Sequence, residues 1–463
     1  MSTVATASPY FEEQSSELQI RHRIIKPIEK KMIPLFTRRH SSSRSFYSIR
    51  NLLFILIFIT FVFILYSSIS LSPLLRFLDP YSYVLVLDAG STGTRIHVYK
   101  FRAATDNENG DTFVLKNEIF KERKPGLSSF ADQIDKAEDQ IDELLKIADQ
   151  EVTRFKHRST PLVLRATAGL RLISETKQKL LLESVAKSFR KYGFYRPKMD
   201  IAIMNETEEG IDAWLTLVYL KGEQFYGSRI AALDLGGGST QITYNPAFEE
   251  EMIMAYMHQF RMFRRDIKLY SRSYLGYGLM IARQTIFMNE TNDQNLINSH
   301  KLKSRCFLND VTGKFKFQDI TWTVQSHGDV NSDERFYSCM STVDHYISLN
   351  VQPAVGLDQM SIYVFSYFYD IANDAGLLST DGDEASSSIR TIPIRVLKQT
   401  AKNVCRGSTS TSQEHPFLCF DLTYIYSLLT KGYGLVEDIE IHICKKIQEF
   451  EVAWSLGLAL KLL

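Results

Sequence analysis

The sequence carries almost no net charge and few cysteines. Its 463 residues sum to a formal charge of +1 at pH 7, so no field of the whole molecule favours a nucleic acid, and we expect no nucleic-acid partner. The 5 cysteines all lie from Cys306 onward, and their spacings are not those of a zinc site. The hydrophobic fraction of 44% is ample for large cores, and the length admits one bilobal enzyme or roughly two to three domains.

Charge is missing altogether from one segment. Residues 51–75 contain no charged side chain, and LLFILIFITFVFILYSSISL within them is almost wholly apolar. As a helix, about 20 such residues span roughly 30 Å, the thickness of a bilayer core. We interpret 51–71 as a signal-anchor transmembrane helix, preceded by a disordered cytoplasmic tail (1–50) and followed by a stem (72–82). A buried helix is the alternative; a cleavable signal peptide is disfavoured by the long segment before the run.

The basic residues near this run lie mainly before it. They are Arg38, Arg39, Arg44 and Arg50, whereas only Arg76 follows closely. The positive-inside rule therefore predicts a cytoplasmic N-terminus and a single-pass type II protein. The rest of the chain is then lumenal or extracellular, where Asn289-Glu290-Thr291 is a candidate glycosylation sequon.

A location in the lumen of the secretory pathway also permits disulfide bonds. The simplest arrangement pairs neighbours along the chain, Cys306 with Cys339 and Cys405 with Cys419, and leaves Cys444 over. The second bridge would close a short loop and contribute roughly 3 kcal/mol to stability.

Two strand-turn-strand segments dominate the remaining sequence. VLVLDAGSTGTRIHVYKF (84–101) and IAALDLGGGSTQITY (230–244) each have an apolar run ending in an aspartate, a turn of small residues, and a second apolar run. This pattern predicts β-hairpins whose turns let backbone N–H groups and hydroxyls approach a phosphate closely. Two such hairpins, carrying Asp88 and Asp234, indicate two related half-domains around one polyphosphate.

Strands and helices alternate around these hairpins. Helical periodicity over 134–150, a strand and turn at 159–174, and a strand, acidic turn and helix at 199–220 predict an α/β fold with mixed sheets. Residues 271–284, which contain Gly276 and Gly278, are interpreted as the start of a helix. Residues 433–463 are interpreted as a strand followed by a final helix. A further helix is expected in the basic segment that contains Arg261, Arg264, Arg265 and Lys268.

Hydrolysis of a phosphoanhydride requires donors around the phosphate oxygens, a divalent cation and a base that orients a water. The turns at Ser91–Gly93 and Gly236–Ser239 are candidate phosphate cradles. Asp88 and Asp234 end apolar strands, so each carboxylate would stand at a strand tip where a metal or its waters could bind. The alternative for each aspartate is a plain turn former.

Glu206, Glu208 and Glu209 form an acidic turn, and one of them is a candidate general base. The alternative is a solvated helix start. Arg95 and Arg171 closely follow turns of small residues. Each of these arginines either binds phosphate or pairs with an acid.

Five motifs occur here in the order of the apyrase-conserved regions: DAGSTGTR, LRATAGLR, ETEEGIDAW, LDLGGGSTQI and SYLGYG. Residues 83–463 therefore resemble the ecto-nucleoside triphosphate diphosphohydrolase (apyrase) family. KPGLSSFAD, FSYFYD and EVAWSLGLAL are similar to the smaller, lumenal nucleoside-diphosphatase branch. That branch likewise has one N-terminal hydrophobic segment and few cysteines.

The resemblance implies a role for each matching residue. Asp88 and Asp234 hold metal-bound waters with help from Thr167, and the cofactor is Ca²⁺ or Mg²⁺. Glu209 is the base that activates water, which Ser239 and Gln241 help to position. Ser91, Thr92 and Gly93, with Gly236, Gly237, Gly238 and Ser239, bind the phosphates. Arg95 and Arg171, found from the residues alone, remain further candidates for substrate binding.

The family's base pocket is an aromatic sandwich, for which Tyr367, Tyr369 or Tyr424 are candidates here; core packing is the alternative for all three. The implied fold is α/β with two ribonuclease-H-like lobes of the actin/hexokinase-like superfamily and the active site in the cleft between them. Lobe I is expected over 83–215 and lobe II over 216–432, with 433–463 returning to lobe I.

The implied function is hydrolysis of nucleoside diphosphates, UDP or GDP, to monophosphate and phosphate in the lumen of the Golgi or endoplasmic reticulum. There it would support glycosylation by clearing the diphosphate left by sugar transfer. One alternative is a broader nucleoside triphosphate diphosphohydrolase. Another is an exopolyphosphatase-like enzyme, because Gly238 stands where the family usually has alanine. A third is a non-catalytic nucleotide-binding module, which needs no base at Glu209.

Overall fold

The computed structural model describes residues 51–64, 79–104, 113–223, 225, 227–247, 251–262, 265–328, 330–378, 389–407 and 414–463. The chain divides into two compact units between Leu75 and Arg76. Residues 51–64 are helical and exposed, and among the described residues no helix is long and apolar enough to cross a membrane. The predicted tail and residues 65–71 of the predicted anchor lie outside the described residues, and so does most of the stem. β1 already begins at Tyr81, inside the predicted stem.

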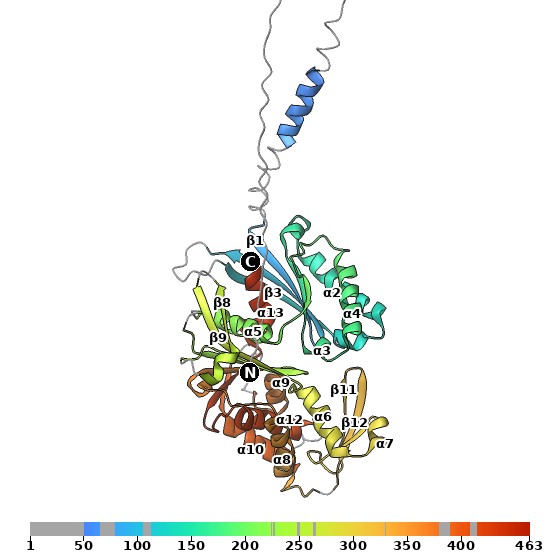
Figure 1. The fold of residues 1–463 in the computed structure, drawn as a ribbon, viewed down its shortest axis with the longest axis vertical. Coiled ribbons are helices and arrows are strands. Elements are labelled where there is room, and N and C mark those ends of the chain that lie inside the picture. The colour runs from blue at the N-terminus through green and yellow to red at the C-terminus, as the bar shows by residue number, and fades with distance from the viewer. Residues whose placement is uncertain are drawn as a thin grey trace, which may run out of the picture. The chain divides into compact units, whose positions relative to one another are not determined.

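The first sheet of the second unit has five strands in the order β3-β2-β1-β4-β5. Their bounds are β1 (Tyr81–Ala89), β2 (Thr94–Ala103), β3 (Phe113–Arg123), β4 (Leu162–Ala166) and β5 (Ile201–Ile203). Helices α2 (Ile134–Glu151) and α4 (Glu175–Phe189) cover one face (Figure 1). Leu85 and Leu87 of β1 share that core with Ile141 of α2, because alternate strand residues point to one face.

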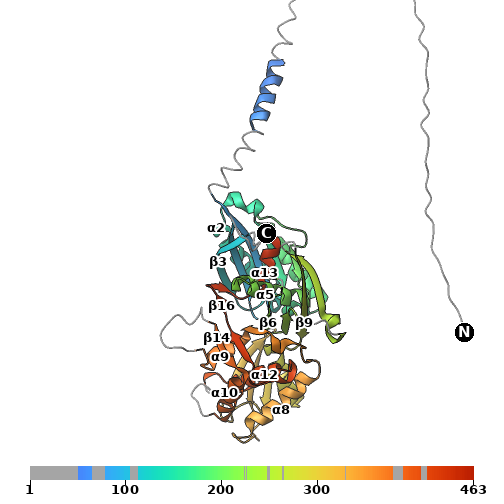
Figure 2. The ribbon, with the colours of Figure 1, turned by 90° about the vertical axis from the view of Figure 1, so that its left-hand side faces the viewer.

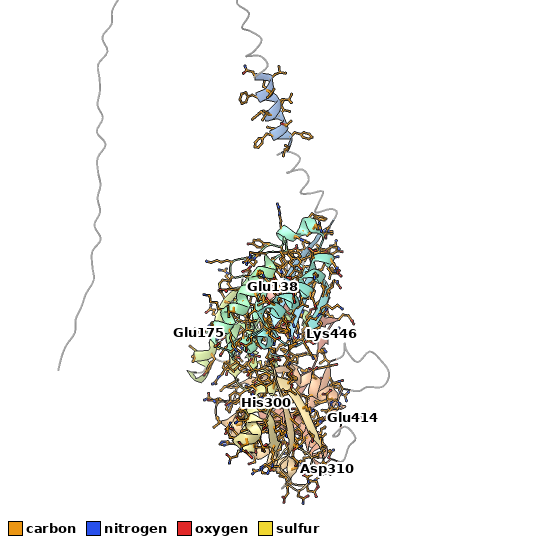
Figure 3. The ribbon with its side chains drawn as sticks, turned by 90° about the vertical axis from the view of Figure 1, so that its right-hand side faces the viewer. Glu138, Glu175, His300, Asp310, Glu414 and Lys446 are labelled. Atoms are coloured by element: carbon orange, nitrogen blue, oxygen red, sulfur yellow. A yellow bond between two sulfur atoms is a disulfide. The ribbon has the colours of Figure 1, made fainter. Side chains whose placement is uncertain are left out.

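Charged pairs support the same two helices from outside. Glu138 of α2 binds Lys187 at 2.8 Å and Lys191 at 2.6 Å, which ties α2 to the end of α4. Figure 3 shows Glu138 and Glu175 in this lobe, and His300, Asp310 and Glu414 in the other. Exposed pairs of this kind each contribute little, roughly 0–1 kcal/mol, so the apolar core carries the stability of this lobe.

The second sheet has seven strands in the order β14-β15-β13-β6-β7-β9-β8. Their bounds are β6 (Ile230–Leu235), β7 (Ser239–Tyr244), β8 (Met257–Met262), β9 (Arg265–Leu275), β13 (Ser361–Ser366), β14 (Arg390–Pro393) and β15 (Glu440–Ile443). The described residues of this unit also form two smaller sheets. One has three strands in the order β10 (Lys301–Ser304), β12 (Ile320–Ser326) and β11 (Thr312–Phe317), and the other is the pair β16 (Lys446–Ile447) and β17 (Phe450–Glu451).

Two helices, α5 (Glu206–Lys221) and α13 (Trp454–Leu462), form a layer between the two large sheets (Figures 1 and 2). Their core includes Val86 of the first sheet, Trp214 of α5 and Phe365 of the second sheet. The Thr216 hydroxyl donates to the Ala453 carbonyl at 2.7 Å, and the Gly457 N–H donates to that hydroxyl at 2.8 Å. The end of the chain therefore packs directly on the helix that begins with the acidic turn.

The core on the outer face of the second sheet is shared with the helices α6 (Leu279–Thr291), α8 (Arg335–Ser348), α9 (Tyr367–Asp374), α10 (Ile394–Arg406) and α12 (Leu418–Ser427). The short helix α7 (Gln294–Asn298) packs instead on α6 and β10. Short helical segments connect the elements of both lobes: α3 (Ala168–Arg171), η1 (Leu127–Phe130), η2 (Arg154–Ser159), η3 (Glu251–Tyr256), η4 (Leu357–Gln359) and η5 (Leu428–Gly432).

The predicted disulfides are confirmed. Cys306 bonds Cys339, and Cys405 bonds Cys419, while Cys444 is free and buried. Burial raises the pKa of the Cys444 thiol to about 12, so this cysteine is a small apolar core residue rather than a reactive thiol.

The prediction of an α/β fold with mixed sheets is confirmed, but the helix predicted in the basic segment is wrong. That segment forms the strands β8 and β9, whose register pairs Arg261 with Asp266. The helix start predicted within 271–284 is found at Leu279, where α6 begins, after β9 ends at Leu275. The error in the basic segment arises because β9 is also held by pairing with β7, a contact that local periodicity does not reveal. The lobe boundaries at 216 and 433 stay a prediction.

Candidate active site

The two lobes enclose a cavity of about 910 Å³. Most of the predicted site residues line it: Asp88, Ser91, Thr92, Arg95, Thr167, Glu209, Asp234, Gly236, Gly237, Gly238, Ser239, Tyr367 and Tyr369. Gly93, Arg171 and Gln241 do not line the cavity. The last two lie directly behind it, because each hydrogen-bonds a residue that does line it.

Asp88 stands near the end of β1, opposite Arg95 of β2. Arg95 Nη1 donates to Asp88 Oδ2 at 3.3 Å, while Nη2 lies 2.7 Å from Glu122 Oε1 of β3. Of the two alternatives for Arg95, the structure therefore shows pairing with acids. Burial raises the pKa of Asp88 although the Arg95 charge opposes that shift.

Asp234 takes the equivalent place near the end of β6, opposite Gln241 of β7. Burial raises the pKa of Asp234 to about 6, with a smaller contribution from the negative charge of Asp88, while a hydrogen bond from Ser366 opposes it. Asp88 and Asp234 are each 7% exposed. Two largely buried strand pairs, β1 with β2 and β6 with β7, thus bring two carboxylates to one cavity, as the duplicated hairpins predict.

Glu209 reaches the cavity from the first turn of α5. Asn205 caps this helix by accepting from the Thr207 N–H at 3.1 Å, and the Glu208 carboxylate accepts from the Asn205 N–H at 3.4 Å. Glu208 is therefore an exposed capping residue, and Glu206 does not line the cavity. Of the three acidic candidates, Glu209 alone is buried, at 7% exposure.

The Glu209 carboxylate has a cationic neighbour. Arg171 Nη2 donates to Glu209 Oε2 at 3.1 Å, and Nη1 donates to the Met204 carbonyl at 2.9 Å, which fixes the guanidinium. Burial nevertheless raises the pKa of Glu209 to about 8; Arg171 opposes this, and the charges of Asp234 and Asp88 add to it. A carboxylate with a pKa near neutrality is matched to proton transfer from water.

Ser239 and Gln241 lie beside this pair. Gln241 Nε2 donates to Ser239 Oγ at 2.7 Å, and Arg171 Nη2 lies 3.5 Å from the same oxygen. Because Ser239 Oγ accepts from its neighbours, its own hydroxyl proton is available to a water or to Glu209. The geometry fits a group that orients a water next to the carboxylate.

The two turns approach each other closely across the cavity. A Cβ placed on Gly237 would lie 2.4 Å from Ser91 Oγ, and one on Gly238 would lie 2.9 Å from Ala168 Cβ. Neither glycine has a positive φ, so close approach of the two lobes is the reason for glycine here. Gly238, which departs from the family's usual alanine, thus faces the small turn after β4.

Of the three tyrosines proposed for the base pocket, two line the cavity and one does not. Tyr367 and Tyr369 of α9 line the cavity, and the Tyr367 hydroxyl hydrogen-bonds Thr92 of the other lobe. Tyr424 does not reach the cavity. It is 0% exposed in α12, and its hydroxyl donates to the Tyr277 carbonyl at 2.7 Å. Core packing, the alternative for Tyr424, is what the structure shows, because all of α12 is buried.

A cation fits between the two aspartates. Oδ1 of Asp88 and Oδ1 of Asp234 are both buried and have no hydrogen-bond partner among the described residues. Buried anionic oxygens without a partner are costly, and a divalent cation or its waters would offset that cost. Thr167 lines the same cavity. Within the described ranges there is no group of three or more His, Cys, Asp or Glu side chains that could hold a metal ion.

Sequence reasoning missed several residues of the cavity, His97 and Ser366 among them. His97 of β2 lines it, and its Nδ1 lies 2.7 Å from Glu118 Oε1. Ser366, where β13 meets α9, lines it as well. The signal for Ser366 was available as the change from a strand pattern to a helix pattern inside SIYVFSYFYDIAND, whereas no local signal marks His97.

Comparisons with known proteins show the family of this chain. Residues 79–463 match the model of the GDA1/CD39 (nucleoside phosphatase) family. The human protein named nucleoside diphosphate phosphatase ENTPD5 is 36% identical over 388 residues, covering 82% of this chain and 87% of that protein. Human ectonucleoside triphosphate diphosphohydrolase 6 is 37% identical over 380 residues, covering 81% of this chain and 76% of that protein.

Among solved structures, the chain is similar to nucleoside triphosphate hydrolases from Neospora caninum. The TM-score is 0.54 at 14% identity, and the match covers 85% of this chain and 95% of that one. This similarity confirms the fold of two ribonuclease-H-like lobes. The chain belongs to the GDA1/CD39 nucleoside phosphatase family and is an enzyme that hydrolyses nucleoside phosphates.

The raised pKa of Glu209 has a consequence for stability. The pKa rises from 4.5 to about 8 on folding, so between these values the folded state holds a proton that the unfolded state has lost. Stability therefore falls as pH rises through this window, by about 3 kcal/mol at pH 7. We expect Glu209→Gln to remove this cost and to be more stable than wild type at pH 7, with no difference near pH 4.

Urea unfolding of both proteins in chelator, from pH 4 to pH 8, measures this difference. Glu206→Gln, in the same helical turn but outside the cavity, is the control and should stay within about 0.5 kcal/mol of wild type. A Glu209→Gln protein that is no more stable than wild type at pH 7 would contradict the burial argument.

Proposed function

We propose that this enzyme hydrolyses nucleoside diphosphates, UDP and GDP among them, to nucleoside monophosphate and phosphate in the lumen of the secretory pathway. The observation that carries the proposal is the buried Glu209 carboxylate, bonded to Arg171 and next to Ser239, in a cavity shared with Asp88 and Asp234. A non-catalytic nucleotide-binding module has no need of such a carboxylate, which costs stability when it is buried.

In the proposed mechanism the turns bind the diphosphate. The N–H groups and hydroxyls of Ser91, Thr92 and Gly93 face those of Gly236 through Ser239, and donors from both lobes hold the phosphate oxygens. Asp88 and Asp234, with Thr167 nearby, would hold Ca²⁺ or Mg²⁺, which would supply positive charge to neutralise the phosphate. Arg95 acts mainly on Asp88, its ion-pair partner, rather than on the phosphate.

Glu209 accepts the proton of the attacking water. Ser239 and Gln241 orient that water, and Arg171 holds the Glu209 carboxylate in place through its hydrogen bond. The terminal phosphate leaves as inorganic phosphate once the water oxygen has replaced the bridging oxygen. Tyr367 or Tyr369 is the proposed contact for the nucleoside, since both rings line the cavity.

The preference for diphosphates is supported by the similarity to human nucleoside diphosphate phosphatase ENTPD5, whereas the second human relative is named for triphosphates. We therefore expect phosphate release by the full chain from UDP and GDP to exceed release from UTP, ATP and polyphosphate. Equal or faster release from triphosphates would favour the broader apyrase alternative. Release from polyphosphate would favour the exopolyphosphatase-like alternative.

Replacement of the proposed base tests the mechanism. Glu209→Gln keeps the size of the side chain but removes proton acceptance, so kcat should fall by at least ~100-fold while nucleotide binding is kept. Glu206→Gln is the matched control and should turn over like wild type. Unchanged phosphate release by Glu209→Gln would rule out this base.

The cation is tested by chelation. Without a cation the phosphate charge meets the buried carboxylates of Asp88 and Asp234, so EDTA should abolish phosphate release, and added Ca²⁺ or Mg²⁺ should restore it. Phosphate release is measured before chelation, after it and after readdition. Full activity in chelator would exclude this mechanism.

A lumenal location is supported by the two disulfides, which persist in oxidising compartments. We propose one type II anchor over 51–71 in the Golgi or endoplasmic reticulum membrane. Protease added to sealed microsomes should then remove only the N-terminal tail and leave a fragment that contains 79–463. Complete digestion without detergent would contradict this topology.

A further inference from the structure

Ser366 has a strained backbone. Its φ of 59° and ψ of −127° lie in a region that favours glycine and costs a residue with a Cβ about 1–3 kcal/mol. It is the last residue of β13 and the N-cap of α9. Such strain persists only where the surrounding structure demands it, and it gathers at functional sites.

The strained residue lies beside Asp234. β13 and β6 are parallel, with Phe365 opposite Asp234 and Ser366 opposite Leu235. Because parallel strands end at the same edge of a sheet, the turn after β13 stands next to the turn after β6. Ser366 and Asp234 both line the cavity between the lobes.

The Ser366 hydroxyl makes a hydrogen bond to the Asp234 carboxylate. In the described residues, Oδ1 of that carboxylate has no hydrogen-bond partner. Asp88, the equivalent group of the other lobe, is instead oriented by Arg95. The guanidinium of Arg95 therefore orients Asp88, whereas the neutral hydroxyl of Ser366 orients Asp234.

The need to form a turn does not by itself explain why residue 366 is a serine. Glycine would adopt the same φ without strain, so the side chain has to offset the cost of its own backbone. The hydrogen bond to Asp234 is the contact that does so, since a hydroxyl bonded to a buried carboxylate contributes about 1.5–3 kcal/mol.

We propose that Ser366 is a positioning residue: its hydroxyl orients the Asp234 carboxylate so that the second oxygen faces a hydrated divalent cation. This rests on the proposed function only through the role of Asp234. The same turn carries Tyr367, whose hydroxyl bonds Thr92 across the cavity, so one strained residue aligns a metal-facing carboxylate and a contact between the lobes.

Three variants separate the hydroxyl from the backbone. Ser366→Ala removes the hydroxyl and keeps the strain, Ser366→Gly removes the hydroxyl and relieves the strain, and Ser366→Thr keeps the hydroxyl. Ser361→Ala, at the exposed opposite end of β13 and outside the cavity, is the matched control.

The readout is the concentration of Ca²⁺ or Mg²⁺ that half-saturates the rise in melting temperature of the full chain. It is measured without nucleotide and with a non-hydrolysable methylene analogue of UDP. We expect both Ser366→Ala and Ser366→Gly to need about 10-fold more cation or worse, and Ser366→Thr to stay near wild type. Without cation, Ser366→Gly should melt above Ser366→Ala.

Two results would overturn the proposal. If Ser366→Gly needs no more cation than wild type, the serine only shapes the turn. A strained serine between a strand and a helix is also the geometry of a nucleophile. Lost turnover with an unchanged cation requirement, together with a phosphoryl group on Ser366 in wild type by mass spectrometry, would assign that role instead.

A different measurement, phosphate release by the wild-type chain, tests the proposed function. A wild-type chain that releases no phosphate from any nucleoside diphosphate would overturn the proposed function. The cation titrations of melting temperature without nucleotide would still compare the four variants, so they test Ser366 independently of turnover.

Discussion

Three carboxylates buried around one cavity, those of Asp88, Glu209 and Asp234, are the constraint on which the rest of the structure depends. Each has lost most of its hydration, and the negative charges of Asp88 and Asp234 raise the pKa of Glu209 beyond the effect of burial. Arg95, Arg171 and the Ser366 hydroxyl offset part of this cost. The unpaired oxygens of the two aspartates leave room for a divalent cation to offset more. A site that is unfavourable when empty is prepared for a ligand that brings positive charge.

The fold delivers these groups from three separate layers. Each large sheet carries one aspartate near the end of a central strand, and the helix α5 between the sheets carries Glu209. Small residues on the facing turns allow the lobes to approach until Gly237 nearly touches Ser91. Because α13 packs on α5 through Thr216 and Gly457, the last residues of the chain hold the helix that positions the proposed base. The position of the proposed base Glu209 therefore depends on the last helix of the chain, α13.

Much of the site could be predicted because its chemistry is local. An apolar strand that ends in aspartate before small residues specifies a turn and a carboxylate within a few positions, and Asn205 with Glu208 specifies a helix start that leaves Glu209 on the inner side. Disulfide partners were found because neighbouring cysteines pair here. The family motifs added roles to these residues, which stay predictions, whereas the match over 79–463 shows the family itself.

The sequence by itself determined the two hairpins, the acidic turn and the α/β class, since turns, caps and strand patterns depend on residues close along the chain. Only the tertiary structure decided that the basic segment is the hairpin of β8 and β9, that Tyr424 is a core residue, and that Arg95 pairs with Asp88 and Glu122. It also decided the φ of Ser366. Strand pairing, burial on every side of a helix and backbone strain all arise from contacts between residues far apart in sequence, which no local pattern records.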